Sequence, residues 1–189
     1  MPGKNAVEKY LNSVKVLIKQ MDSKQIEPII NRLQTCIQNG NKILICGNGG
    51  SAADASHFAG ELVCKFRKTR KALPAVALTV DTAVLTAVGN DFSFDSIFSR
   101  QVEAIGNKGD VLIAITTSGK SRNIIEAAKT ATAYGLSVIS LTSSLSENPY
   151  WADISWLSNT TETSHTQEQM LIVIHAICLA LEDELAEEK

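Results

Sequence analysis

Long hydrophobic runs are missing from this sequence. The longest apolar stretches, such as Val111–Ile115 and Met170–Ile174, are far shorter than the roughly 20 residues that a transmembrane helix needs. The segment Met1–Met21 mixes lysine and glutamate with apolar residues and has no continuous apolar core, so it does not resemble a secretory signal. We therefore expect a soluble, cytoplasmic protein with no membrane partner.

Cysteines are few and widely spaced. The four of them, Cys36, Cys46, Cys64 and Cys178, form no Cys-x-x-Cys pair. This spacing argues against a thiolate metal site and against a disulfide framework. It favours buried free thiols in a reducing compartment.

Positive charge is not concentrated in a large block. The formal net charge is −2, and one basic run stands out, made of Lys65, Arg67, Lys68, Arg70 and Lys71. Binding to a nucleic-acid duplex usually needs a wider basic surface. We therefore interpret this run as the solvated end of a helix, and we expect no nucleic-acid partner.

What is present fits one globular domain. The 189 residues include 44% hydrophobic and 20% charged residues, and no linker, repeat or low-complexity tract divides them. We expect N-terminal helices in residues 1–40, an α/β core in residues 41–160 and a C-terminal helix in residues 161–189.

The hydrophobic period changes along the chain. Helical spacing from Val7 to Ile18 and from Ile26 to Ile37 predicts a helical pair that is broken near Asp22. Short apolar runs that each predict a strand come next: Lys42–Cys46, Pro74–Val80, Val111–Thr116, Ser137–Thr142 and, more weakly, Ile154–Leu157. Helical patterns alternate with these runs. One of the helices begins at Asp81, a good capping residue, and a long last helix is predicted from about Ser164 to Leu185.

Continuous apolar strands that alternate with helices are typical of a parallel sheet covered on both faces. The pattern predicts a single doubly wound α/β domain with an N-terminal helical pair and a long C-terminal helix. In such sheets ligands bind beyond the carboxyl ends of the strands, at helix N-termini. Two loops rich in Gly, Ser and Thr lie at those places.

The first loop, Gly47–Ser51, follows a strand and opens a helix. Gly47, Gly49 and Ala52 formally satisfy the dinucleotide fingerprint, but no acidic residue ends a second strand about 20 residues later. A Walker A loop is excluded because Lys and Ser/Thr do not follow the glycines. We expect no nucleotide cofactor, and a purely structural tight turn remains an alternative.

The second loop, Thr116–Ser121, offers hydroxyls, backbone N–H groups and the start of a helix. It resembles the end of a P-loop, yet Ala114 stands where the first glycine of a P-loop is needed. Hydroxyls beside a helix N-terminus suit a phosphate monoester. The alternative is ordinary helix capping by Ser118 or Ser121.

His57 and Glu61 lie four residues apart on the helix after the first loop, so their side chains share one face. By spacing alone such a pair is more often a surface hydrogen bond than a catalytic site. Its position on a helix that starts at a ligand loop favours a functional role.

These residues belong to stretches that together resemble the phosphoheptose isomerases, whose fold is the SIS domain. The stretches are CGNGGSAADASHFAGEL (Cys46–Leu62), VGNDFSFDSIFSRQVEAIGNKGDVLIAITTSGKS (Val88–Ser121) and the pair Gln167 and His175 on the last helix. The similarity covers nearly the whole chain in order. It implies a single flavodoxin-like or Rossmann-like SIS domain.

The resemblance also implies an activity. Members of the family are aldose–ketose isomerases that convert sedoheptulose 7-phosphate to D-glycero-D-manno-heptose 7-phosphate by enediol-type proton transfer. This is the first step towards the heptose of bacterial lipopolysaccharide and other surface polysaccharides. A homotetramer with active sites at subunit interfaces is implied as well.

Residue roles follow from the same resemblance. Glu61 is implied as the catalytic acid or base and His175 as its counterpart. One Zn²⁺ per subunit is implied, with the ligands His57, Glu61, Gln167 and His175. Substrate contacts are implied at Asn48, Gly49, Gly50, Ser51, Glu61, Asn90, Asp91, Thr116, Thr117, Ser118, Ser121 and Gln167.

Spacing alone does not suggest this zinc site, because Gln167 and His175 lie about 12 Å apart along a helix. His175 fits equally well as a hydrogen-bonded core histidine within the apolar stretch Leu171–Leu181. Zinc bound to Glu61 would also weaken that carboxylate as a base, so the metal acts either as a Lewis acid or as an organiser of the site.

Some positions depart from the family pattern. Lys120 replaces the usual asparagine, Ser143–Asn159 lacks the usual glycine-rich segment, and Ser164-His165-Thr166 replaces a segment that normally contains Arg. These departures bear on the identity of the sugar. The alternatives are an SIS isomerase for another phosphosugar, a nucleotide-dependent enzyme, and a non-catalytic phosphosugar-binding or initiator-associating module, although the last would not be expected to keep both Glu61 and His175.

Overall fold

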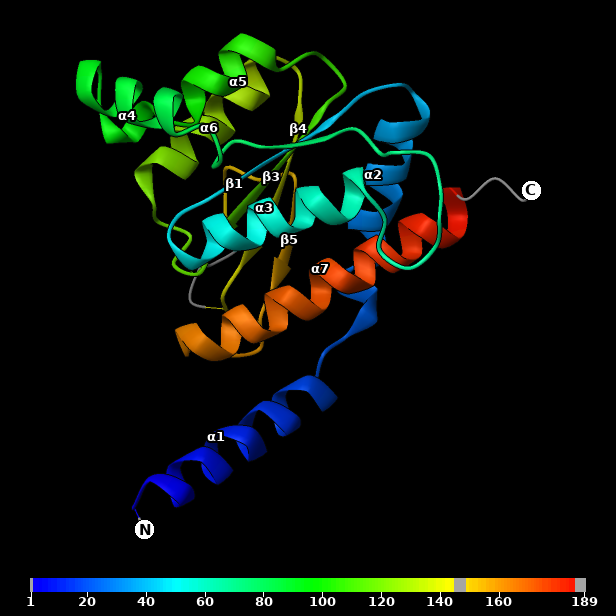
Figure 1. The fold of residues 1–189 in the computed structure, drawn as a ribbon, viewed down its shortest axis with the longest axis vertical. Helices are drawn as coiled ribbons and strands as arrows, with labels where there is room; N and C mark the ends of the chain where they lie inside the picture. Colours follow the sequence, from blue (N-terminus) through cyan, green and yellow to red (C-terminus); the bar gives the residue numbers. More distant parts are fainter. Residues whose placement is uncertain (1, 145–148, 186–189) are drawn as a thin grey trace.

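The computed structural model describes residues 2–144 and 149–185, and the predicted segments that run past these bounds lie partly outside it. The elements in chain order are α1 (Pro2–Lys19), η1 (Ser23–Gln25), α2 (Glu27–Gln38), β1 (Ile43–Gly47), α3 (Gly50–Val63), β2 (Ala75–Ala77), α4 (Thr82–Asp91), η2 (Phe94–Ser96), α5 (Ser99–Ile105), β3 (Val111–Thr116), α6 (Arg122–Ala133), β4 (Ser137–Thr142), β5 (Ile154–Leu157) and α7 (Thr163–Leu185). Figure 1 shows the strands at the centre with helices around them.

The strands form one parallel sheet in the order β2-β1-β3-β4-β5. Ile45 of β1 pairs with Ala77 of β2 on one side and with Ile113 of β3 on the other. All five residues of β1 and all six of β3 are buried. Such runs need apolar side chains at every position because both faces of the strand are covered.

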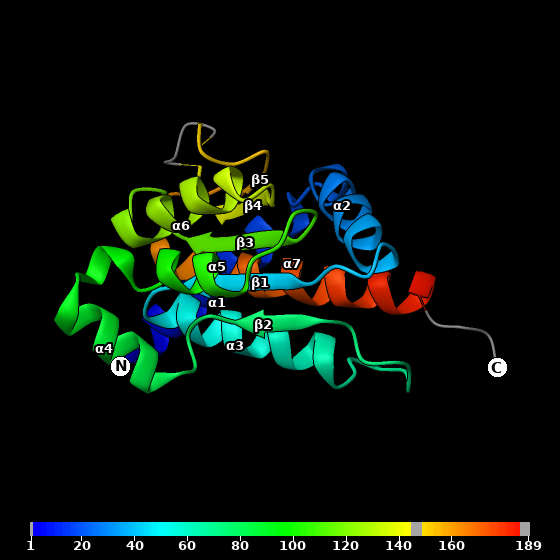
Figure 2. The same cartoon turned by 90° about the horizontal axis from the view of Figure 1, so that it is seen from above.

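Helices cover the two faces of the sheet in separate layers. On one face α2, α3 and α7 pack against strand residues such as Ile43, Ile45 and Ile113. On the other face α5 and α6 pack against the alternate residues, among them Leu44 and Leu112. Figure 2 shows the sheet between these layers. The predicted doubly wound α/β fold, with its helical pair and long last helix, is confirmed.

The N-terminal helix α1 lies apart from both layers in Figure 1. Its described contacts are with the region around the start of α7. Tyr10 stacks on His165 with ring centroids 4.9 Å apart, and the Ser13 hydroxyl lies 3.0 Å from His165 Nε2. The helix leaves apolar side chains such as Leu11 and Val16 more than half exposed.

Strand β2 is shorter than predicted. The run Pro74–Val80 was expected to be a strand, but only Ala75–Ala77 is one. Leu78 N still donates to Ile45 O at 2.8 Å, after which Thr79 turns its hydroxyl to Ser56 Oγ on α3, 2.9 Å away. The prediction of a cap was right, since Asp81 Oδ1 accepts from Val84 N at 3.0 Å.

The basic run does not end a helix, because α3 stops at Val63 and residues 64–74 form a loop. Four of its side chains are exposed as expected, but the Arg70 side chain is only 2% exposed. The interpretation as a solvated segment is therefore wrong for Arg70.

The cysteines are free, as predicted, and three of the four are buried. Burial raises the pKa of the Cys46 and Cys178 thiols to about 12, which keeps them as unreactive thiols. Cys64 is exposed, contrary to the expectation of burial. Within residues 2–144 and 149–185, no helix is long and apolar enough to cross a bilayer.

The buried carboxylate of Asp110, just before β3, binds the residue just before β1. Asp110 accepts from Lys42 N at 3.0 Å and from Asn107 N at 2.9 Å, and it forms an ion pair with Lys42 Nζ. Burial alone would raise its pKa, but these donors outweigh burial and hold the pKa of the Asp110 carboxyl below its usual value.

We expect Asp110→Asn to lower the free energy of unfolding by about 2 kcal/mol at pH 7, because the amide leaves buried N–H donors without an anionic acceptor. The contribution of Asp110 is complete above the unfolded pKa, near 4, and disappears as the pH falls through the lower folded pKa. Urea titrations at several pH values measure both effects. Glu103→Gln, at an exposed position, is the control, and equal losses in the two variants would contradict the assignment.

Candidate active site

The strand order identifies where a ligand binds. In a sheet with the order 2-1-3-4-5 the crevice lies at the carboxyl ends of β1 and β3, where the chain reverses direction across the sheet. The loops that leave these strands are Gly47–Ser51 and Thr116–Ser121, the two loops singled out from the sequence. The fold therefore brings both predicted ligand loops to one place.

The first loop depends on the absence of side chains. A Cβ on Gly47 would lie 2.4 Å from the backbone oxygen of Ser51, a separation that atoms cannot adopt. Gly49 has φ 57°, a conformation that favours glycine. The chain therefore turns directly from β1 into α3, with Asn48 in the turn and Ser51 buried in the first turn of the helix.

A pair of asparagines joins the two loops. Asn48 and Asn123 exchange two hydrogen bonds, each 2.8 Å long, between their side-chain amides. Asn123 is 2% exposed, and its Oδ1 also accepts from Ile124 N at 3.0 Å. Sequence analysis missed Asn123, although a polar residue on the buried face of a helix that opens at a ligand loop is a usable signal.

The second loop gathers hydroxyls. Thr116 Oγ1 lies 3.5 Å from Ser118 Oγ and 3.4 Å from Ser121 Oγ. Ser121 is the N-cap residue of α6, yet its side chain makes no capping hydrogen bond. The capping alternative is therefore wrong for Ser121, and its hydroxyl faces the loop. Lys120 is exposed.

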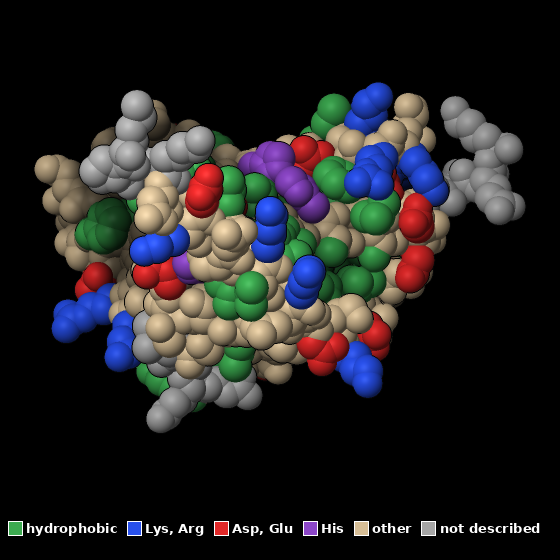
Figure 3. All heavy atoms as spheres, turned by 90° about the horizontal axis from the view of Figure 1, so that it is seen from below, with side chains coloured by type: hydrophobic (Ala, Val, Ile, Leu, Met, Phe, Trp, Pro, Cys, Tyr) green, Lys and Arg blue, Asp and Glu red, His purple; other side chains and the backbone are tan. Residues whose placement is uncertain are grey.

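A second cluster lies further along α3. His57 Nε2 is 2.9 Å from His175 Nε2 on α7 and 3.8 Å from Glu61 Oε1. The Phe66 ring stacks on the His175 ring with centroids 5.3 Å apart. Figure 3 shows histidine side chains together at the molecular surface, among hydrophobic ones. His175 is thus half-buried and reaches other site residues, rather than being a core histidine.

Gln167 lies on α7, two turns before His175, and faces the start of α3. Its Nε2 is 2.9 Å from the place where a Cβ on Gly50 would be, so this glycine makes room for the amide. A hollow of about 360 Å³ lies between Gly50, Asp54 and Gln167. Burial raises the pKa of the Asp54 carboxyl, against the opposing effect of His57. Asp54 is a second polar residue that sequence analysis missed.

Asn90 and Asp91 are not drawn into either cluster. They end α4, are exposed, and are joined to each other by a 2.8 Å hydrogen bond from Asn90 Nδ2 to Asp91 Oδ1. No hydrogen bond among the described residues links their side chains to the two loops.

The cluster of His57, Glu61 and His175 is the candidate metal site. No three His, Cys, Asp or Glu side chains of the described residues stand ready-made around a common point. However, two ligands of tetrahedral zinc lie about 3.3 Å apart, and the 2.9 Å and 3.8 Å separations around His57 Nε2 bracket that value. Two imidazoles and a carboxylate therefore fit zinc after small shifts, whereas Gln167 lies about 12 Å from His175 along α7, beside Gly50 at the start of α3.

We expect Gly47→Ala to destabilise the protein by about 2 kcal/mol or more, because the new methyl group collides with backbone at the turn into α3. Gly60→Ala is the matched control, since nothing lies within 4 Å of a Cβ there and alanine favours the helix interior. Thermal unfolding followed by circular dichroism measures both. A Gly47→Ala protein as stable as Gly60→Ala would refute the close contact.

Comparisons with known proteins agree with this geometry. The family model described as the SIS domain matches residues 9–143. A phosphoheptose isomerase from Clostridium acetobutylicum is 44% identical over 192 aligned positions, which cover 98% of each chain. Solved phosphoheptose isomerases from Neisseria gonorrhoeae and Francisella tularensis superpose with TM-scores of 0.84 and 0.91, at 36% and 34% identity, and cover 97% of this chain and 100% of theirs. The chain therefore belongs to the SIS-domain family and, within it, to the phosphoheptose isomerases.

Proposed function

We propose that this chain interconverts sedoheptulose 7-phosphate and D-glycero-D-manno-heptose 7-phosphate, as an aldose–ketose isomerase. The observation that carries the proposal is the meeting of His57 and Glu61 of α3 with His175 of α7, on a helix pair whose first member begins at the first ligand loop. The near full-length similarity to phosphoheptose isomerases supports the choice of substrate. The product is a precursor of heptose in bacterial lipopolysaccharide and related surface polysaccharides.

The phosphate is proposed to bind in the second loop. The phosphate dianion would accept hydrogen bonds from the loop hydroxyls and from the N-terminus of α6, so its binding would not require a bound cation. The hydroxyls are those of Thr116, Thr117, Ser118 and Ser121. The sugar hydroxyls are proposed to contact Asn48, Gly49, Gly50, Ser51 and Gln167, with Asn90 and Asp91 closing the site.

The reaction moves one proton between adjacent carbons. A base takes a proton from C1 of the ketose, the C–H electron pair forms the C1–C2 double bond, and the C2 carbonyl oxygen keeps the displaced pair and takes a proton, which gives the enediol. The C1 hydroxyl then loses its proton and becomes the aldehyde carbonyl, while the pair of the double bond takes a proton at C2. We assign Glu61 as the group that carries the carbon-bound proton and His175 as the group that exchanges protons with the oxygens. His57, 2.9 Å from His175, holds that imidazole in place.

We further propose one zinc ion per subunit, held by His57, Glu61 and His175. Gln167, the fourth ligand that the resemblance implies, would join them only if its side chain left its place beside Gly50. When bound, zinc would polarise the substrate oxygens as a Lewis acid. The donor types and the spacing around His57 support this assignment.

Zinc removal is expected to lower activity. Purified protein should contain about one zinc per chain by elemental analysis, and His57→Ala should lower that content severalfold, because it removes the donor that lies between Glu61 and His175. Cys64→Ser, at an exposed thiol, is the control. Full zinc content in His57→Ala would exclude the proposed ligand set.

A homotetramer in the cytoplasm is proposed as the working state. The exposed apolar side chains of α1 and the exposed end of α4 support burial between subunits, and the free thiols support a reducing compartment. Sites at subunit interfaces would bring Asn90 and Asp91 to a neighbouring cluster. The mass of the assembly in solution tests this state.

The two ends of the site are expected to respond differently to substitution. Glu61→Gln should lower kcat about 1,000-fold with little change in KM, while Ser121→Ala should raise KM about tenfold with little change in kcat. Steady-state kinetics with sedoheptulose 7-phosphate and with a panel of other ketose phosphates measure this. Glu126→Gln, on the exposed face of α6, is the control. No turnover of any ketose phosphate by zinc-loaded protein would favour a non-catalytic binding module.

A further inference from the structure

A buried carboxylate holds the loop that follows α3. Glu182 on α7 is 0% exposed and accepts from three consecutive backbone N–H groups, those of Phe66, Arg67 and Lys68, at 2.7, 2.8 and 2.9 Å. Burial would raise its pKa, but these donors and the charge of Arg70 hold the pKa of the Glu182 carboxyl below its usual value. Glu182 is therefore an anion in a cradle of backbone donors.

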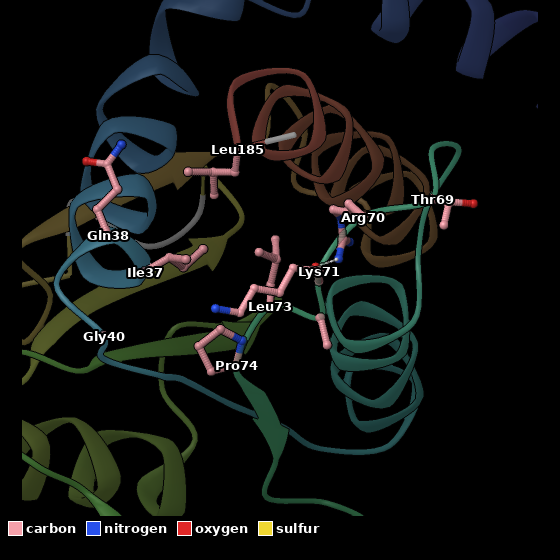
Figure 4. Close-up of a pocket in the computed structure, with 10 residues that line it drawn as sticks. Ile37, Gln38, Gly40, Thr69, Arg70, Lys71, Leu73, Pro74 and Leu185 are labelled. Atoms are coloured by element: carbon pink, nitrogen blue, oxygen red, sulfur yellow. Dashed lines mark hydrogen bonds between the residues drawn. The ribbon is translucent and has the colours of Figure 1, made fainter. Parts of the chain in front are cut away.

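Arg70 connects the same loop to α3. Its Nε lies 3.4 Å from Glu182 Oε1, and its Nη atoms donate to the backbone oxygens of Glu61, Leu62 and Lys71 at 2.8, 2.8 and 3.0 Å. The oxygens of Glu61 and Leu62 belong to the last turn of α3, where the helix offers no N–H partner. Arg70 lies between the ends of α7 and α3 in Figure 4.

The outer side of this loop is not packed. A cavity of about 560 Å³ separates residues 69–74 from the end of α2 and from Leu185, and Arg70, Leu73 and Ile37 line it. Figure 4 shows these side chains around the open space. The loop is held from the inner side, by the three backbone hydrogen bonds to Glu182, by the Arg70 hydrogen bonds to backbone oxygens and by the buried side chain of Leu73.

The loop places an aromatic ring against a site residue. The Phe66 ring stacks on His175 at an interplanar angle of 27°, while His57 meets the same imidazole edge-on, with centroids 5.2 Å apart. His175 is only half-buried, so without Phe66 one face of its ring would be open to water. A half-buried side chain with an open face has other rotamers available.

We propose that Phe66 is a positioning residue for His175, and that the buried Glu182–Arg70 pair fixes the loop from which Phe66 acts. The stacking keeps His175 Nε2 directed at His57 Nε2, which in turn lies 3.8 Å from Glu61 Oε1. The kinetic part of this inference rests on the proposed isomerase function, while the geometric part does not.

The kinetic test compares Phe66→Leu, which keeps apolar bulk, with Phe66→Tyr, which keeps the aromatic face. Phe66→Leu should lower kcat at least tenfold with KM within about twofold, because a displaced catalytic group costs mainly turnover. Phe66→Tyr should stay within about threefold of the parent in kcat. Equal activity of Phe66→Leu and the parent, or equal loss in both variants, would overturn the proposal.

A chemical test does not depend on the substrate. Diethyl pyrocarbonate acylates accessible imidazoles, and mass spectrometry of peptides follows each histidine separately. In Phe66→Leu, His175 should react severalfold faster than in the parent, while His165, which stacks on Tyr10, should react at an unchanged rate. An unchanged rate of His175 modification would exclude the positioning role of Phe66, even in a protein with isomerase activity. A changed rate in a protein without turnover rejects the proposed function alone.

The role of the buried Glu182–Arg70 pair is tested by substitutions at two neighbouring carboxylates on α7, Glu182 and Asp183. Glu182→Gln replaces one carboxylate oxygen by an amide NH2 group that faces backbone N–H groups, so it should reproduce the faster His175 modification at temperatures where the variant is still folded. Asp183→Asn, which alters only the exposed pair with Lys68, should leave that rate unchanged. Identical His175 rates in the two variants would show that the buried pair does not fix Phe66.

Discussion

The parallel packing of α3 and α7 on one face of the sheet is the constraint on which the site depends. The two helices run in the same direction and in register, so residues at equal heights meet (Figure 1). Gly50 meets Gln167 at the first turn, His57 meets His175 two turns later, and the loop after α3 meets Glu182 further on. Each contact is local, but all of them rely on the same buried seam of Phe58, Leu62, Val173 and Ile177. A shift of one helix along the other would separate all three pairs together.

The site has a polar end and an imidazole end, and different parts of the fold control them. The polar end is set by the strand order, which places the loops after β1 and β3 side by side and lets Asn48 bond Asn123. The imidazole end is set by helix–helix contact and by the loop that Glu182 holds. A long, flexible sugar phosphate suits this division, because one end can be gripped by hydroxyls while chemistry occurs at the other.

The sequence predicted those features that depend on neighbours in the chain. The runs Val111–Thr116 and Ser137–Thr142 are strands with those bounds, because a strand buried on both faces is rich in apolar and β-branched residues over its whole length. Pro74–Val80 was overpredicted because an edge strand has one partner, and the chain leaves it once Thr79 bonds to α3. The burial of Arg70 and the role of Glu182 could not be predicted, since their partner lies more than 100 positions away. The assignment of the catalytic and zinc-binding roles comes from resemblance, and the structure brings His57, Glu61 and His175 together but leaves Gln167 beside Gly50.

The direction of the helices has an electrostatic consequence for ligand capture. α3, α6 and α7 all begin at the carboxyl edge of the sheet, so the positive ends of their peptide dipoles surround the crevice although the chain carries a formal net charge of −2. These partial charges are fixed to the backbone and act within hydrogen-bonding range. Dissolved salt screens charges separated by more than about 8 Å at physiological strength and has little influence at contact distance. The proposed phosphate site would thus rely mainly on rigid amides, in a protein whose formal net charge is negative.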